Sequence, residues 1–145
     1  MRVQTKPFGE IEVNELQRLE FPLGVFGFEQ LRSYVLLDAS EQPFYWLQSL
    51  DRPTVAFVLI DPRVFMPDYV LDVSDEELES IGLTEPADLL DFVIVTVPPV
   101  PRDMTANLQG PIVVNRRSRA ARQCISRNPD YGVRRRIIDP ASHGR

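Results

Sequence analysis

The residue types that perform most enzyme and metal chemistry are scarce in this sequence. Its 145 residues include one histidine, His143, and one cysteine, Cys124. A hydrolytic triad needs an imidazole that other side chains can orient, and a zinc site needs three or four His, Cys or carboxylate ligands. A lone cysteine in an apolar strand is usually a small packed side chain. We therefore expect no catalytic residue, no metal site and no intrachain disulfide.

Two glycines, Gly24 and Gly27, could suggest a phosphate-binding loop. The sequence around them lacks the third glycine of a dinucleotide fingerprint and the Lys-Ser/Thr pair of a P-loop. No cofactor site is predicted.

Carboxylates are the remaining groups with catalytic potential, and seven of them fall between residues 61 and 79. A carboxylate pair can cleave a glycosidic bond or hold a divalent cation. The alternation of an EF-hand loop is absent, however, and helical spacing would turn Glu76, Glu77 and Glu79 to solvent with Leu78 and Ile81 inward. The pattern favours an acidic, protein-binding surface.

Charge is distributed unevenly along the chain. Residues 1 to 100 contain 6 Lys and Arg against 18 Asp and Glu, whereas residues 101 to 145 contain 10 against 3. An acidic body suits a basic partner, or it is simply a solvated face. The alternative is direct RNA binding through the basic C-terminal third, although the acidic body would repel phosphate and Tyr131 is the only aromatic residue beside these arginines. The arginines concerned are Arg116, Arg117, Arg119, Arg122, Arg134, Arg135 and Arg136.

The elements that must position these groups are mostly strands. A first hairpin around Gly9 is followed by β-branched or aromatic runs that are bounded by Asp, Pro, Gly or Ser. Two of the runs are apolar throughout, which predicts cover on both faces. The fold class is mainly β: a small antiparallel β-barrel-like single domain with one or two short helices. The predicted strands cover residues 34–37, 44–47, 54–60, 92–97 and 112–114.

Local signals place the helices and turns. Ser74 begins a capping box, Gly82 ends that helix, and Pro86 marks a second helical turn. Prolines are expected between strands, Trp46 in the core, and residues 21–29 in a tight loop that folds its aromatic rings inward. Residues 116–119 read as a hairpin tip. We expect a domain from residue 1 to 126, then a basic, flexible tail from 127 to 145.

Five blocks in a fixed order resemble the bacterial flagellar assembly factor FliW family. They are residues 21–29, residues 47–49, Asp61-Pro62, Asp68-Tyr69 and residues 105–115, and the resemblance runs from about Val3 to Ile125. It implies a cytoplasmic, non-enzymatic protein, in keeping with the absence of a signal peptide or membrane span. The family's implied partners are flagellin and the translational regulator CsrA, which FliW-like proteins antagonise to relieve repression of flagellin messenger RNA. No direct contact with nucleic acid or membrane is expected.

Candidate partner-binding residues come from the matched blocks and from the acidic stretch. A turn-building role for Asn107 is left open beside a contact role. The candidates are Asp61, Pro62, Phe65, Asp68, Tyr69, Asp72, Asp75, Glu76, Glu77, Asn107 and Pro111.

Overall fold

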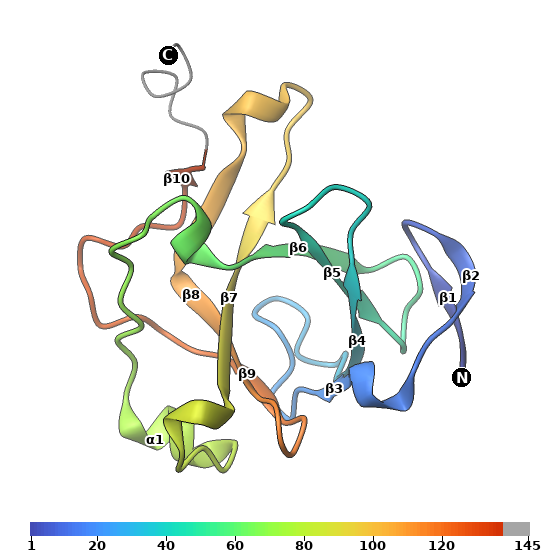
Figure 1. Ribbon diagram of the computed structural model, residues 1–145, viewed down its shortest axis with the longest axis horizontal. Coiled ribbons are helices and arrows are strands. Elements are labelled where there is room, and N and C mark those ends of the chain that lie inside the picture. Colours follow the sequence, from blue (N-terminus) through green and yellow to red (C-terminus); the bar gives the residue numbers. More distant parts are fainter. Residues whose placement is uncertain (138–145) are drawn as a thin grey trace.

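A computed structural model describes residues 1–137 of the chain, so His143 and the last part of the expected tail lie outside the described residues (Figure 1). The described chain is a nearly closed, barrel-shaped antiparallel sheet with a separate two-stranded hairpin, which confirms the predicted fold class. The hairpin comprises β1 (Arg2–Thr5) and β2 (Gly9–Glu12). The other strands are β3 (Arg18–Glu20), β4 (Ser33–Asp38), β5 (Tyr45–Ser49), β6 (Ala56–Ile60), β7 (Leu89–Thr96), β8 (Thr105–Asn115), β9 (Ala121–Gln123) and β10 (Arg135–Arg136).

The helical elements are short and lie in the connections. The helix α1 (Asp75–Ser80) begins at the predicted capping box, and η3 (Pro86–Asp88) begins at the predicted proline. Three further 3₁₀ turns, η1 (Glu15–Gln17), η2 (Pro62–Val64) and η4 (Pro101–Asp103), were not predicted. Glu29 and Gln30 lie in a hydrogen-bonded turn, in which the Leu31 amide donates to the Phe28 carbonyl at 3.0 Å.

Strands β3 to β8 follow one another as a meander, and the barrel closes where β3 meets the chain between β8 and β9. The Glu20 amide donates to the Arg119 carbonyl at 3.0 Å, and Glu20 forms a parallel bridge with Ala120. Residues 116–118 form the expected turn between β8 and β9. Closure therefore depends on residues about one hundred positions apart in the sequence.

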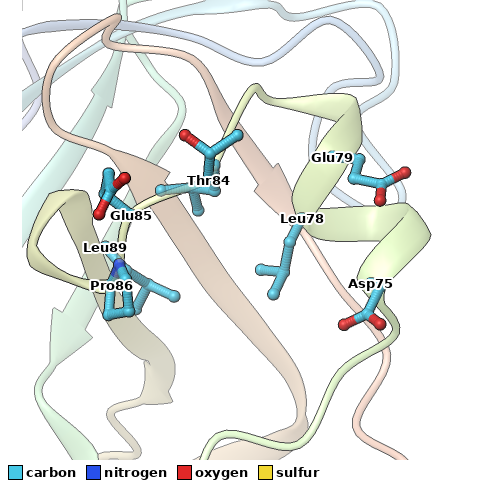
Figure 2. Close-up of a pocket in the computed structure, with 8 residues that line it drawn as sticks. Asp75, Leu78, Glu79, Thr84, Glu85, Pro86 and Leu89 are labelled. Carbon is cyan, nitrogen blue, oxygen red and sulfur yellow. The ribbon is translucent and has the colours of Figure 1, made fainter.

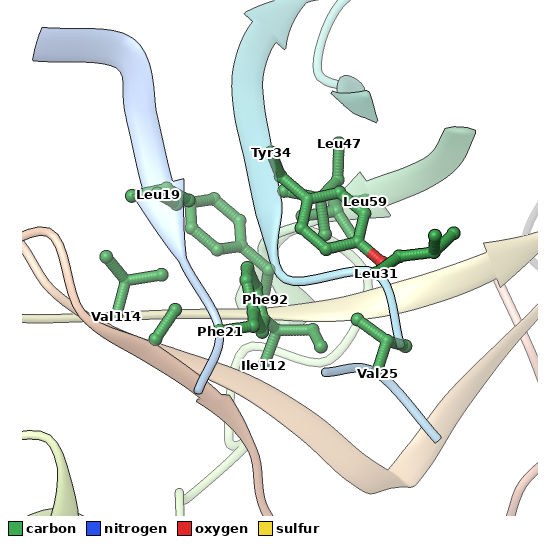
Figure 3. Close-up of a cluster of buried hydrophobic side chains, with 11 residues drawn as sticks. Leu19, Phe21, Val25, Leu31, Tyr34, Leu47, Leu59, Phe92, Ile112 and Val114 are labelled. Atoms are coloured by element: carbon green, nitrogen blue, oxygen red, sulfur yellow. The ribbon is translucent and has the colours of Figure 1, made fainter. Parts of the chain in front are cut away.

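The barrel interior is a cluster of apolar side chains from every strand from β3 to β9 (Figure 3). Tyr34, Phe21 and Leu47 are fully buried, and the Phe21 and Tyr34 rings meet edge to face at 5.1 Å. The outer faces of β7 and β8 are also covered, with Val93 and Val113 both fully buried. The side chains that cover these outer faces come from the 61–71 segment, α1 and the C-terminal segment. This confirms the prediction that an unbroken apolar strand is covered on both faces.

One local expectation was wrong, and two were right only in part. Pro111 lies inside β8, at a bulge where four residues (Leu108–Pro111) face one residue of β7. Proline has no backbone N–H to donate to a neighbouring strand, and at this bulge the hydrogen bonds between β7 and β8 are already interrupted. Trp46 is only partly buried, because it faces outward from the barrel beside Phe8. In the 21–29 loop, Phe26 remains 51% exposed although Phe21 and Val25 are buried.

The expected flexible tail is docked on the barrel as far as Ile137. The Leu108 amide donates to the Gly132 carbonyl at 2.9 Å, and β10 pairs with Thr105 and Ala106 at the start of β8. The Tyr131 ring stacks on Tyr69 at 5.1 Å. We call residues 127–137 the C-terminal strap, and it is part of the folded domain.

Candidate functional site

The 61–71 segment, which holds five of the predicted contact residues, is mostly packed against the sheet. Asp61 caps η2 by accepting from the Arg63 amide at 3.0 Å, Pro62 is buried, and Tyr69 is 5% exposed. Phe65 is half-buried against the same outer core. Asp68 is exposed, and the Asp61 side chain is 47% exposed while it caps η2. These residues mainly hold the segment in place.

An ion pair fixes this segment to the barrel. The Arg63 guanidinium donates to both carboxylate oxygens of Asp91, at 3.1 and 3.2 Å, and lies 5.2 Å from the centre of the Tyr69 ring. The Asp91 side chain is 8% exposed. Burial raises the pKa of Asp91, and the hydrogen bonds from Arg63 offset part of that rise. Such a pair is structural, because the Asp91 carboxylate is buried and Arg63 is its ion-pair partner.

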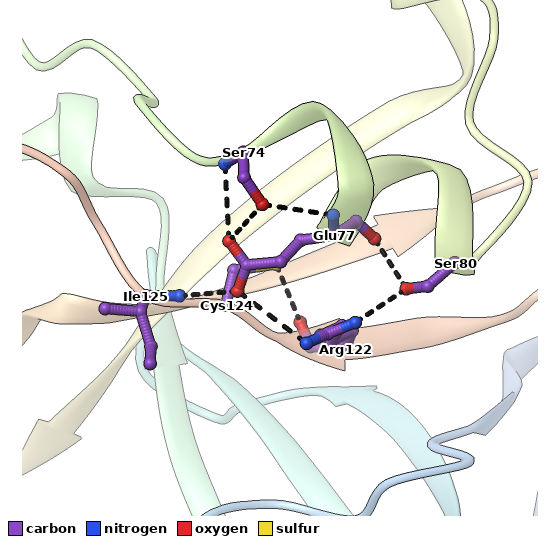
Figure 4. Close-up of polar contacts among 6 residues, drawn as sticks. All are labelled: Ser74, Glu77, Ser80, Arg122, Cys124 and Ile125. Atoms are coloured by element: carbon purple, nitrogen blue, oxygen red, sulfur yellow. Dashed lines mark hydrogen bonds and ion pairs between the residues drawn. The ribbon is translucent and has the colours of Figure 1, made fainter.

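Glu77 differs from its neighbours on α1, because it turns inward (Figure 4). Its carboxylate accepts from the Ser74 amide at 3.3 Å and from the Ile125 amide at 3.0 Å, while the Ser74 hydroxyl accepts from the Glu77 amide at 3.2 Å. Arg122 lies 4.0 Å from the same carboxylate, whose side chain is 12% exposed. The expectation that Glu77 faces solvent was wrong. The capping box needs this carboxylate at the N-terminus of the helix.

The carboxylates that do face solvent gather around a hollow between α1 and η3 (Figure 2). The hollow has a volume of about 300 Å³ and an apolar floor that includes Leu78, Leu83 and Leu89. Within residues 1–137, none of these carboxylates lies within 4.0 Å of a basic nitrogen. Of these carboxylates, Asp75, Glu79 and Glu85 line the hollow, whereas Glu76 is exposed on α1 and Asp88 is half-buried in η3. We call the five together the acidic surface.

Glu85 and Asp88 were missed as candidates because they follow the glycine that ends the helix. The chain turns back at Gly82, where φ is +71°, and thereby carries η3 to the other side of the hollow from α1. The Asn115 amide group, which donates to the Ile81 carbonyl at 2.9 Å, fixes this return. Pro86, the first residue of η3, predicted this helical turn and therefore the positions of Glu85 and Asp88 in it. The approach of η3 to α1 could not be predicted, because it depends on the tertiary fold.

Asn107 and Pro111 lie in the β8 bulge rather than at the acidic surface. The Asn107 side-chain oxygen accepts from the amides of Gln109 and Gly110, both at 3.0 Å. Gln123 then joins the bulge to the 21–29 loop: it donates to the Gly110 carbonyl at 3.0 Å and accepts from the Phe26 amide at 2.8 Å. Two of the sequence blocks that carry the family resemblance therefore meet in one hydrogen-bonded network.

The basic residues do not form one surface. Arg116 and Arg117 are exposed at the turn after β8, whereas Arg135 and Arg136 pair with the residues at its start. The extended strand between them separates the two groups by roughly 30 Å. Arg122 donates to the Ser80 hydroxyl at 3.0 Å, and Arg136 pairs with Asp103 at 3.0 Å. This arrangement does not support an RNA-binding site.

Among residues 1–137 there is no cluster of three His, Cys, Asp or Glu side chains that could hold a metal ion. The same residues include no helix long and apolar enough to cross a membrane. Cys124 is fully buried beneath α1, and this burial raises the pKa of its thiol to about 12, with the Glu77 charge adding to the rise.

Comparison with known proteins decides the family. The family model described as "FliW protein" matches residues 2–137. The chain belongs to the FliW family. It is 48% identical to the flagellar assembly factor FliW of Leptospira biflexa over 139 residues, which cover 94% of this chain and 91% of that protein. It is 41% identical to the flagellar assembly factor FliW of Treponema denticola over 138 residues, covering 95% and 94%.

A solved structure agrees with this assignment. The crystal structure of a flagellar assembly factor FliW superposes with a TM-score of 0.88 at 37% identity, over 96% of this chain and 98% of that one. The family match reaches residue 137, beyond the limit near Ile125 that the sequence blocks indicated. The C-terminal strap therefore falls within the part that matches the FliW family.

Proposed function

We propose that this protein is a non-enzymatic flagellar assembly and regulatory factor that binds flagellin in the cytoplasm and, when free, binds and antagonises CsrA. Antagonism of CsrA would relieve repression of flagellin messenger RNA. The observation that carries the proposal is FliW-family membership over residues 2–137, joined to an acidic surface whose carboxylates have no ion-pair partner within those residues.

The acidic surface supports an electrostatic mechanism. CsrA binds RNA through basic surfaces, so unpaired carboxylates attract it over a distance of about 10 Å, the Debye length at moderate salt. Once docked, the same charges repel RNA phosphates and weaken RNA binding without occupying the RNA site. By linkage, RNA weakens the binding of this protein to CsrA by the same factor. The apolar floor of Leu78 and Leu89 adds contact area beneath the charges.

Competition between flagellin and CsrA would turn secretion into a signal. While flagellin accumulates, it holds the factor, and when flagellin is exported the freed factor binds CsrA. The exposed Phe26 and Leu23 of the 21–29 loop, at 51% and 58% exposure, and the groove beside Trp46 offer apolar contact area away from the acidic surface.

Isothermal titration calorimetry with purified CsrA tests the proposal. We expect a stoichiometric complex at low salt whose affinity falls as salt is raised, because the attraction is between exposed charges. Flagellin added first should reduce the amount of complex. Absence of any heat of binding at low salt would remove CsrA as a partner, and an affinity independent of salt would remove the electrostatic mechanism. In the same buffer, a gel-shift assay with flagellin messenger RNA leader should show no direct binding.

A further inference from the structure

One carboxylate at the edge of the acidic surface already binds an arginine of the same chain. Arg127, the first residue of the C-terminal strap, donates from Nε at 2.9 Å and from Nη2 at 2.7 Å to one carboxylate oxygen of Asp72. Asp72 lies two residues before Ser74, the cap of α1. Asp72 is thus the carboxylate of the segment leading into α1 that an arginine of the same chain neutralises, whereas those of the acidic surface stay unpaired among the described residues.

The Arg127–Asp72 pair is exposed and therefore weak. The Arg127 side chain is 62% exposed and that of Asp72 is 42% exposed, in contrast to Asp91 at 8%. Exposed pairs of this kind contribute little to stability, because water screens both charges. An arginine from another protein can replace this one at little cost.

The Arg127 side chain is not what holds the strap in place. The Arg127 backbone amide donates to the Asp72 carbonyl at 2.8 Å, independently of the side chain. Farther along, Tyr131 stacks on Tyr69 and its hydroxyl accepts from the Val70 amide at 3.2 Å. Removal of the guanidinium should therefore free Asp72 while the strap stays docked.

We propose that Arg127 is an internal competitor: its guanidinium occupies Asp72 as an arginine of a basic partner protein would, and such a partner binds the acidic surface by displacing it. The inference rests on the proposed function for the identity of that partner, CsrA. The competition itself does not depend on CsrA, because any protein that presents an arginine to Asp72 would have to displace Arg127. The strap thus lowers the affinity of the acidic surface and restricts it to partners that supply their own arginines.

Arg127→Gln tests this inference, and Arg136→Gln is its matched control. Each substitution removes one positive charge of the strap and breaks one exposed ion pair. Arg136 pairs with Asp103 of η4, in the β7–β8 connection, at the opposite end of the barrel from α1 (Figure 1). We expect R127Q to bind CsrA about two- to fivefold more tightly than the unsubstituted protein, and R136Q to change the affinity by less than about 1.5-fold. Equal effects of the two substitutions, or weaker binding by R127Q, would overturn the proposal.

A double-mutant cycle shows whether Arg127 acts through Asp72. Asp72→Asn removes the shared carboxylate, so the variant with both R127Q and D72N should bind like D72N alone. A gain from R127Q that persists in the absence of Asp72 would contradict the mechanism. Arg127→Lys, which keeps the charge but loses the planar fork, should give a smaller gain than R127Q, and it serves as the test if R127Q does not fold.

A labelled nona-arginine peptide separates this inference from the proposed function. If CsrA fails to bind the unsubstituted protein but the peptide binds R127Q more tightly than R136Q, the proposed partner is wrong and the internal competitor stands. If CsrA binds but neither probe distinguishes R127Q from R136Q, the internal competitor is wrong and the proposed function stands.

Discussion

Residues 61–71 carry two carboxylates and one arginine, residues 72–88 carry seven carboxylates, and the charged groups of the two segments do different things. In the first segment Arg63 joins Asp61 and the buried Asp91, and the aromatic residues face the sheet. In the second, Glu77 turns inward, Asp72 pairs with Arg127, and the other carboxylates have no ion-pair partner among the described residues. Three of them, Asp75, Glu79 and Glu85, line the apolar hollow. The lesson is that a count of charges along the chain does not tell which of them another protein can reach.

The largest expected effect is on the reactivity of the Cys124 thiol. This thiol is buried under α1, so its reactivity tests how tightly the 72–88 segment packs on the sheet. Because the pKa of the thiol is raised from 9.0 to about 12, its thiolate fraction at pH 8 should be about a thousandfold lower than in the unfolded chain. Iodoacetamide should therefore label the native protein very slowly at pH 8 and label it rapidly in denaturant, as read by mass spectrometry.

The same thiol predicts a pH dependence of stability. The pKa of the thiol is higher in the folded protein than in the unfolded chain, where it is 9.0. The free energy of unfolding is therefore unaffected by this group below pH 9, and it falls as the pH rises from 9 toward 12, because the unfolded chain then loses the proton first. Rapid native labelling at pH 8 would show that α1 opens readily and that the second segment is loose rather than fixed.

Arg63→Ala should cost about 3 kcal/mol of unfolding free energy, because it leaves the Asp91 carboxylate buried without its partner. Arg127→Ala removes the same side chain from an exposed pair and should cost less than about 1 kcal/mol. Urea denaturation of both variants measures the difference. Equal losses would erase the distinction between the two segments.

Glu77→Ala should cost about 2 kcal/mol, since the amides of Ser74 and Ile125 lose a charged acceptor. Glu76→Ala, one position earlier on the exposed side of α1, should cost only a few tenths of a kcal/mol through the helix dipole. Thermal unfolding followed by circular dichroism compares the two. A stable Glu77→Ala protein would return Glu77 to the list of partner contacts.

The smallest expected effect is on binding alone. The double substitution Glu79→Gln and Glu85→Gln, on the two sides of the hollow, should weaken CsrA binding about two- to fivefold at low salt and leave the melting temperature unchanged. A control with Glu15→Gln and Glu41→Gln makes the same change in net charge at exposed sites outside the acidic surface. Equal weakening in both variants would mean that total charge matters and the acidic surface does not.

Local signals predicted much of the fold. The capping box at Ser74, the proline at Pro86 and the apolar runs of β4 to β8 each have their cause within a few residues, so they could be read from the chain. The double cover of β7 was also readable, because an unbroken apolar run needs two apolar layers.

The parts that could not be predicted depend on contacts between distant residues. Pro111 is tolerated in β8 because Asn107 and Gln123 stabilise the bulge. The turn-building role of Asn107 is local and was left open from the sequence, but the approach of Gln123 is not visible in a local window. Arg134 to Arg136 resembled a solvated tail, but the docking of the strap relies on Tyr131 and on the open edge of β8. For the candidate site, the acidity of the region was predictable. The burial of Tyr69 and Glu77 and the arrival of Glu85 were not, since each requires the position of another element.

The closure of the barrel at Glu20 and Ala120 also sets the order in which a growing chain can fold. The meander from β4 to β7 pairs neighbours in sequence and can assemble early, on short loops. The pairing that closes the barrel joins Glu20 to Ala120, which is synthesised one hundred residues later. Leu19 and Phe21 therefore lack part of their apolar packing until Ala121 has left the ribosome. During translation the N-terminal half is therefore an open, apolar sheet, and the interval before closure is when this protein is most exposed to aggregation and to chaperones.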